Sequence, residues 1–285
     1  MKIYDCFQFF DEEMLLDLRL NIMGKYVDKF VITEATYSHN GEPKRLIFDI
    51  NKFSKFKDKT IYIVVDNQPL NLHVINDNDN DKKDTRGQKL VLNGYKRDNY
   101  QRQMAQQVLD KIDPDDWIII NDIDEIPNLK KIDFKNIKNK LVLFKQQMFY
   151  YKFNLLYPST AWFGSKACRK KNFLSPQWLR NIRQKKYNNI FIVKDGGWHF
   201  TNIKSPEDIE KKFLNYTHHY EFKLSGLKLE DLRKIVKEKK IIYDHSQDQT
   251  GYKWGSNATL NTVGLSEMPD YLKENYQKYN SWLDI

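Results

Sequence analysis

The residues best suited to chemistry in this chain follow one apolar run. Trp117–Ile120 is continuously apolar, and the carboxylates Asp122, Asp124 and Glu125 lie within the next five positions. Such a run predicts a buried central strand, and the alternation of a strand would point Asp122 and Asp124 to the same side. Two carboxylates on one side repel each other unless a cation lies between them. Hard oxygen ligands suit Mn²⁺ or Mg²⁺ held jointly with substrate phosphates, so we expect a metal site here.

Two further motifs carry residues that would complete such a site. His199 follows a pair of glycines in "GGWHF", and it is either a third metal ligand from a distant loop or an ordinary packed histidine. Arg97 and Arg102 lie upstream of the acidic strand in "KRDNYQRQMA". They are surface charges of a helix or, if that helix flanks the pocket, partners of a diphosphate, which the forked donors of arginine suit.

The elements that must position these residues alternate between strand and helix. Strand, helix and strand at this spacing predict a parallel α/β sheet, and ligands of open α/β sheets bind outside the carboxyl ends of the strands. The expected strands are Lys2–Phe10, Phe30–Thr33, Ile61–Val65, Trp117–Ile120, Leu141–Tyr151 and Asn188–Val193. The expected helices are Asp11–Gly24, with Asp11 as N-cap, Arg97–Ile112, and one opened by Ser205 and Pro206.

Composition narrows the class of protein. The chain has 285 residues, 40% of them hydrophobic, and no convincing linker, which favours one domain. A net charge of +9 suits an anionic ligand, nucleic acid or an anionic membrane surface, although scattered lysines are also typical of a solvated surface. The two cysteines form no disulfide framework, and no signal peptide or membrane anchor is visible. We therefore expect a soluble protein of the cytoplasm, or of the host cytoplasm if the chain is viral.

Seven segments of the chain, in order from about Tyr4 to about His219, resemble glycosyltransferase family 17. The best-known members of this family are β-1,4-mannosyl-glycoprotein β-1,4-N-acetylglucosaminyltransferases, and this chain looks closer to short, soluble members of bacterial or viral type. The segments are "YDCFQFFDEEMLLDLRL", "VDKFVITEATYSHNGEPKRLIF", "DDWIIINDIDEIP", "MFYYKFN", "AWFGS", "SPQWLRNIR" and "GGWHF".

The resemblance implies a GT-A fold, which is a Rossmann-like, mostly parallel central sheet flanked by helices, here with a helical C-terminal part. Residues 1–285 would form one domain, with a nucleotide-sugar half at about 1–127 and an acceptor and metal-loop half at about 128–285. The family would be a metal-dependent, inverting hexosyltransferase. By resemblance the donor would be a UDP-sugar, with UDP-GlcNAc as the first choice, and the acceptor a glycan, glycolipid or glycoprotein.

The resemblance also implies roles for single residues. Asp122 and Asp124 would hold the metal and the diphosphate, and His199 would be a metal ligand. The nucleoside would lie near Phe7 and Glu34. In this arrangement Arg97 and Arg102 would face the donor.

The mechanism of such an enzyme follows from its leaving group. A cation and arginines would neutralise the charge that develops on a nucleoside diphosphate. Inversion in one displacement needs a carboxylate that deprotonates the acceptor hydroxyl. Glu125 and Asp195 are the candidate bases, with Glu207, Asp208 and Glu221 as further possibilities. Stacking on an acceptor sugar would come from aromatic side chains, which are otherwise core residues. The candidates are Trp162, Trp178, Trp198 and Tyr151.

Two other functions compete with this interpretation. A metal-dependent nucleotidyl- or phosphotransferase acting on nucleic acid would also use paired carboxylates and a basic surface. The basic residues are not gathered into a stripe, however, and no P-loop is present, so we expect no nucleic-acid partner. A non-catalytic carbohydrate-binding protein would explain the aromatic residues but not the acidic metal motif.

Overall fold

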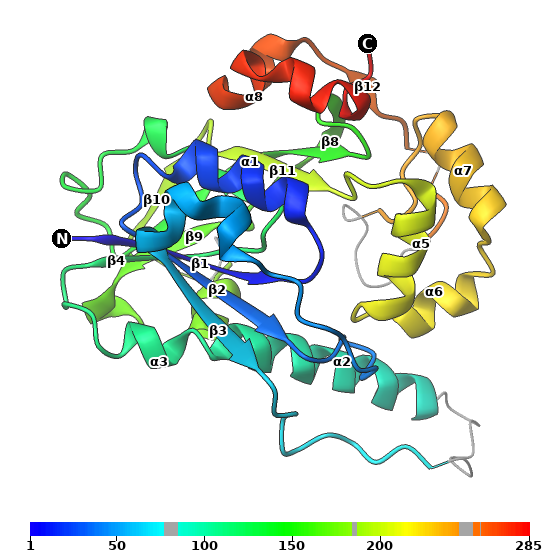
Figure 1. Ribbon diagram of the computed structural model, residues 1–285, viewed down its shortest axis with the longest axis horizontal. Coiled ribbons are helices and arrows are strands. Elements are labelled where there is room, and N and C mark those ends of the chain that lie inside the picture. The colour runs from blue at the N-terminus through cyan, green and yellow to red at the C-terminus, as the bar shows by residue number, and fades with distance from the viewer. Residues whose placement is uncertain (77–84, 184–186, 245–252, 257) are drawn as a thin grey trace.

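The computed structural model describes residues 1–76, 85–183, 187–244, 253–256 and 258–285. It shows an α/β protein in which a mixed, mostly parallel sheet is flanked by helices, with a smaller second sheet beside it (Figure 1). The helices α5, α6 and α7 lie together at one side of the molecule, away from β1, β2 and β3 (Figure 1). None of the described helices is both long enough and apolar enough to cross a membrane.

The larger sheet has seven strands in the order β10-β6-β9-β4-β1-β2-β3. All neighbouring pairs are parallel except those made by β9, which runs antiparallel to both β4 and β6. The strands are β1 (Ile3–Phe9), β2 (Lys29–Ala35), β3 (Thr60–Val65), β4 (Trp117–Ile120), β6 (Leu141–Phe144), β9 (Lys166–Arg169) and β10 (Ile190–Val193). The expected α/β sheet is confirmed as a mostly parallel one, and β4 has the bounds that its apolar run predicted.

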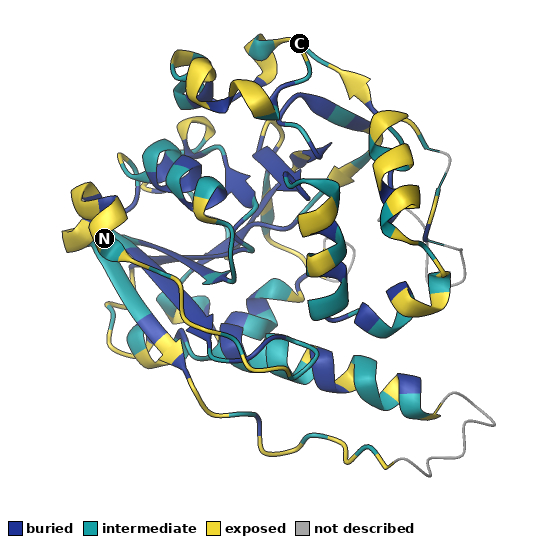
Figure 2. Cartoon of the chain, turned by 45° about the vertical axis from the view of Figure 1, so that its right-hand side comes forward, coloured by how far each residue is buried: buried dark blue, intermediate teal, exposed yellow. Residues whose placement is uncertain are grey.

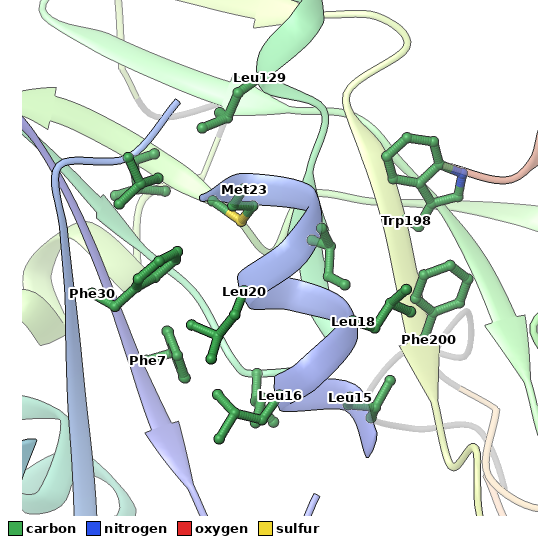
Figure 3. Close-up of a cluster of buried hydrophobic side chains, with 14 of the residues drawn as sticks. Phe7, Leu15, Leu16, Leu18, Leu20, Met23, Phe30, Leu129, Trp198 and Phe200 are labelled. Carbon is green, nitrogen blue, oxygen red and sulfur yellow. The ribbon is translucent and has the colours of Figure 1, made fainter. Parts of the chain in front are cut away.

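Helices cover both faces of this sheet. On one face α1 packs on alternate side chains of β1 and β2 such as Phe7 and Phe30 (Figure 3). On the other face α2, α3 and α4 pack on the intervening side chains, including Cys6 and Val31. The helices are α1 (Glu13–Met23), α2 (Thr85–Gln103), α3 (Gln106–Leu109), α4 (Pro176–Arg180), α5 (Pro206–Asn215), α6 (His219–Ser225), α7 (Leu229–Lys237) and α8 (Asp270–Glu274), with 3-10 turns η1 (Ile50–Lys59), η2 (Leu129–Lys131), η3 (Lys170–Asn172), η5 (Leu265–Glu267) and η6 (Tyr276–Trp282).

The smaller sheet has five strands in the order β12-β8-β7-β11-β5. Its strands are β5 (Glu125–Pro127), β7 (Gln146–Tyr150), β8 (Leu155–Trp162), β11 (Gly197–Thr201) and β12 (Asn261–Thr262). The single strand expected over Leu141–Tyr151 is therefore wrong. The chain leaves the larger sheet after β6 and enters the smaller one as β7, and Lys145 bonds there to the backbone of Val193 and Gly196.

Two other sequence expectations need correction. The helix expected over Arg97–Ile112 begins earlier, at Thr85, and is interrupted after Gln103. Asp11 is not the N-cap of α1, because Glu12 holds that position and its carboxylate accepts from the backbone N–H groups of Phe10 and Asp11 instead. The cap of α5 is as expected, since the Ser205 hydroxyl accepts from the N–H of Asp208.

Burial follows the layers of the fold. The strands of the sheets are mostly buried, and the outer faces of the helices are exposed (Figure 2).

Candidate active site

A cavity of about 880 Å³ opens at the carboxyl ends of β1 and β4. That volume lies in the range of ordinary ligand pockets, and its position is the one at which open α/β sheets bind ligands. Its lining includes Asp122, Asp124, His199, Arg102, Arg180 and Trp162. The structure thus brings the acidic motif, the histidine, one of the two predicted arginines and one of the three predicted tryptophans to one place.

The acidic turn lies where the chain passes from one sheet to the other. It leaves β4 of the larger sheet and enters β5 of the smaller one, where Glu125 pairs directly opposite His199 of β11. The backbone N–H of Phe200 donates to the Asp124 carbonyl at 2.8 Å. Gly197 has a φ of 120°, and a Cβ there would lie 2.2 Å from the Ile126 carbonyl oxygen, so the pairing requires glycine. Strand pairing therefore places His199 beside Asp124.

Asp124 and His199 form a pair whose chemistry fits a divalent cation. His199 Nε2 lies 3.6 Å from Asp124 Oδ1, and both side chains are largely buried. Adjacent ligands of an octahedral ion with bonds of about 2.1 Å lie about 3 Å apart, so a small movement would let both bind one ion. Burial raises the pKa of Asp124, but His199 and then Lys212 lower it further, and the net direction is down.

Asp122 has a different environment from Asp124. Its Oδ1 accepts from Arg102 Nη2 at 3.1 Å and its Oδ2 accepts from Arg180 Nη2 at 2.5 Å. Burial opposes ionisation, yet the attraction of Arg180 and Arg102 holds the pKa of Asp122 well below its usual range. The residues described contain no group of three or more His, Cys, Asp or Glu side chains placed to hold a metal. The expected trio is thus divided, with Asp124 and His199 together and Asp122 held by arginines.

Strand alternation is not what orients the two aspartates. β4 ends at Ile120, and the next residues form a turn in which the N–H of Glu125 donates to the Asp122 carbonyl at 3.0 Å. Both side chains still line the cavity, because the buried side chain of Arg19 holds the backbone of the turn from behind.

Arg19 of α1 holds the acidic turn by its backbone. Its Nη1 donates to the carbonyls of Asp122, Ile123 and Glu125 at 3.3, 3.3 and 2.7 Å. Its Nε and Nη2 donate to the two oxygens of Asp5 at 2.9 and 2.6 Å, and both side chains of this ion pair are 0% exposed. Because the carbonyls point toward Arg19, the aspartate side chains can point away from it, into the cavity.

Glu125 lies beneath the cavity and is fully engaged. It is 0% exposed, and its carboxylate accepts from Arg180 Nη1 at 2.9 Å, Arg180 Nη2 at 3.0 Å, Trp162 Nε1 at 2.5 Å and the N–H of Asp122 at 2.9 Å. A Cβ on Gly164 would lie 1.9 Å from Glu125 Oε1, so glycine makes room for this carboxylate. In this arrangement Glu125 anchors Arg180 and Trp162. Asn121 Nδ2 donates to Asp5 Oδ1 at 2.7 Å. We call Asp5, Arg19, Asn121, Glu125 and Arg180 the floor of the site.

Asp195, the other candidate base, is not brought to the cavity. It is 79% exposed and lies 3.5 Å from Lys131. The further acids are engaged outside the cavity lining: Glu207 pairs with Arg233, Asp208 accepts from Ser205, and Glu221 lies 3.0 Å from His218.

Three of the predicted donor-binding residues lie outside the cavity lining. Phe7 turns into the core against Phe30, under the Arg19 guanidinium (Figure 3). Glu34 is buried and accepts from Tyr62, Lys44 and the backbone of Ile47 and Phe48. Arg97 donates to Gln68 and to the His39 carbonyl. Arg102 is the exception, since it reaches the cavity.

Of the predicted tryptophans, Trp162 lines the cavity and its ring stacks on that of His199 with centroids 5.0 Å apart. Trp198 belongs to the core around α1 (Figure 3), and its Nε1 donates to the Glu267 carbonyl. Trp178 packs against the core on the other face of the sheet, and Tyr151 is buried. The cavity is also lined by the aromatic residues Tyr95, His218 and Tyr243, which were not predicted from the sequence.

Comparison with known proteins shows what the chain is similar to. The model of glycosyltransferase family 17 matches residues 1–284. The beta-1,4-mannosyl-glycoprotein 4-beta-N-acetylglucosaminyltransferases of Homo sapiens and Rattus norvegicus are each 31% identical over 121 residues. These matches cover 40% of this chain and 19% of each relative, so the chain spans about a fifth of the length of those enzymes.

Among solved structures, HddC from Yersinia pseudotuberculosis aligns at 11% identity, over 68% of this chain and 91% of that chain. The TM-score is 0.33, which is too low to show a shared fold.

Proposed function

The chain belongs to glycosyltransferase family 17, and on that premise we propose that its cavity transfers a sugar from a nucleotide-diphosphate donor to a hydroxyl of a carbohydrate acceptor. The observation that supports the site most directly is the Asp124–His199 pair beside Asp122, at the carboxyl end of β4. We further propose that the architecture is a GT-A fold and that transfer inverts the anomeric centre.

A divalent cation, Mn²⁺ or Mg²⁺, would be held by Asp124 and His199. Such an ion neutralises charge on the phosphates of the donor and on the leaving group. Asp124 is suited to this role because its pKa is lowered and His199 lies beside it, while the oxygens of Asp122 are bound by Arg102 and Arg180. Asp122 would instead present a fixed, ionised acceptor to hydroxyl groups of the donor.

The donor is proposed to be UDP-GlcNAc. The support is the activity of the human and rat relatives, which are N-acetylglucosaminyltransferases and align with a part of this chain. The nucleoside would bind near the end of β1, where Gln8 and Phe10 line the cavity, of which His39 is also a lining residue.

The acceptor is proposed to enter at the aromatic part of the cavity. Trp162, Tyr95 and His218 line it, and Tyr95 is 41% exposed. Rings of this kind give sugars an apolar face to stack on and a polar edge to bond to. A glycan, a glycolipid or a glycoprotein would fit this description.

The test is donor turnover by the purified chain. UDP-GlcNAc, UDP-glucose, UDP-galactose and GDP-mannose are each incubated with Mn²⁺, without an acceptor, and release of the nucleoside diphosphate is measured. We expect slow hydrolysis of one of them, dependent on Mn²⁺ and lost in Asp124→Asn. The matched control is Asp195→Asn, which removes an exposed carboxylate outside the cavity and should retain hydrolysis. No hydrolysis of any donor, together with tight and steeply salt-dependent binding of RNA or DNA, would contradict the proposal.

A further inference from the structure

The cations that line the cavity differ in what they are bound to. Arg102 and Arg180 are committed to carboxylates, as described above. Lys166 is buried and donates to the Arg180 carbonyl, and burial, with Arg180 nearby, lowers its pKa to about 7. Arg183 is exposed at the edge of the described range 85–183. Two of these four cations thus have carboxylate partners, Lys166 has a lowered pKa, and Arg183 is exposed.

Lys212 has a different environment from the other four. It lies on α5 and lines the cavity, and its Nζ donates to the Asn202 Oδ1 at 2.9 Å. Within the described part of the chain, no carboxylate lies within ion-pair distance of Lys212. Its partner is therefore a neutral amide, and its charge is not compensated by direct contact. A partly buried ammonium in this state favours an anion.

Asn202 fixes the direction of Lys212. It is 5% exposed and has a φ of 54°, a left-handed conformation that a non-glycine residue adopts at some cost. It lies between the end of β11 and the start of α5, so it links the strand that carries His199 to the helix that carries Lys212. The amide oxygen thereby holds the ammonium on the side of the cavity where Asp124 lies, close enough for Lys212 to act on that carboxylate.

We propose that Lys212 binds the diphosphate of the nucleotide donor. The inference rests on the proposed function. It places the diphosphate between the ammonium of Lys212 and the Asp124–His199 pair. Of the two arginines expected to face the donor, Arg97 lies outside the cavity lining, and Arg102 lines the cavity but is bound to Asp98 and Asp122.

The test compares two neighbouring lysines of one helix. Lys212→Gln removes the charge that faces the cavity, and Lys211→Gln removes an exposed charge from the same helix, with no part in the cavity lining. Both variants change the net charge equally, so any difference is local. Binding of UDP, UMP and inorganic pyrophosphate is measured by calorimetry with Mn²⁺, at 50 mM and 300 mM salt. Geranyl diphosphate is added to the panel to separate a nucleotide from an isoprenoid source of the diphosphate.

We expect Lys212→Gln to weaken UDP and pyrophosphate about 10- to 100-fold, as for loss of a hydrogen bond between charged groups, and UMP much less. Lys211→Gln should stay within about twofold, since an exposed charge is screened.

Equal UDP affinities in the two variants would overturn the role of Lys212 and leave the proposed function standing. A wild-type chain that binds no nucleotide would overturn both. Binding of geranyl diphosphate alone, dependent on Lys212, would overturn the assignment to the donor.

Discussion

The floor and the wall of the cavity treat charge in opposite ways. In the floor, Asp5 meets Arg19 at 2.6 Å and Glu125 meets Arg180 at 2.9 Å, and both carboxylates are 0% exposed. In what we call the wall, Asp124, His199 and Lys212, the Asp124 Oδ1 lies 3.6 Å from His199 Nε2 and Lys212 donates to the neutral amide of Asn202. Buried charges that are fully paired add little stability over an apolar core, and removing one partner is costly. The difference suggests that the floor fixes the geometry of the turn and that the wall meets ligands.

Arg19→Met is expected to have the largest effect on the floor. It leaves Asp5 buried without its cation and takes one donor away from each of the carbonyls of Asp122, Ile123 and Glu125. We expect a loss of about 3–5 kcal/mol in the free energy of unfolding, measured by urea denaturation. Arg233→Met is the control, because its ion pairs with Glu207 and Glu230 are exposed and should contribute less than about 1 kcal/mol. Similar losses in the two variants would remove the distinction drawn for the floor.

His199→Gln tests the wall, where we expect a large effect on metal binding and little effect on stability. If His199 is a metal ligand, Mn²⁺ affinity should fall by about tenfold or more, while the urea midpoint stays close to that of the wild type. The measurement is a Mn²⁺ titration followed by electron paramagnetic resonance. An unchanged titration, or a variant that fails to fold, would make His199 a packed core residue instead.

Lys166→Met should change how stability depends on pH. Burial lowers the pKa of Lys166 to about 7 in the folded chain, whereas a lysine ordinarily has a pKa of about 10.5. Between these values the unfolded chain binds more protons, so this lysine makes wild-type stability rise with pH across that window. Lys166→Met lacks the effect, and its stability relative to the wild type should be about 4 kcal/mol higher at pH 7 than at pH 10.5. A constant difference across the window would show that Lys166 does not titrate there.

Tyr95→Ala should have the smallest effect, confined to the acceptor. Loss of one stacking ring would raise the KM for the acceptor about threefold and leave the KM for the donor unchanged. Tyr276→Ala is the control, because Tyr276 is exposed to a similar extent and lies outside the cavity lining. A rise in donor KM would place Tyr95 at the nucleotide instead.

Local pattern predicted the strands of the larger sheet except β9, the antiparallel strand between β6 and β4. β4 matches its apolar run residue for residue, because every side chain of the run is buried and the run is bounded by polar residues. The same reasoning failed over Leu141–Tyr151, where it predicts one strand although polar Lys145, Gln146 and Gln147 interrupt the apolar pattern where the chain passes from one sheet to the other. The interruption marks the end of β6, but it does not show which sheet the next strand joins.

The site was predicted only as far as its residues are close in sequence. Asp122 and Asp124 were found from one short motif, whereas Arg180, which binds Asp122, is 58 residues away. Arg19 lies between Leu18 and Leu20 in α1 and is buried with them. A charged residue between two leucines of a predicted helix was a signal that the sequence offered. Phe7 and Glu34 stand at strand ends as expected, but their side chains turn into buried contacts instead of the cavity.

The most direct test of this account is thermal unfolding of the wild type, Asp124→Asn and Asp195→Asn with UDP, each with and without Mn²⁺. Ligand at 100 times its dissociation constant stabilises a protein by about 2.7 kcal/mol, which is readily measured. We predict a stabilisation of the wild type and of Asp195→Asn that needs Mn²⁺ and is absent in Asp124→Asn. A stabilisation by UDP that persists in Asp124→Asn, or that is absent from the wild type under all conditions, would contradict the assignment of the site.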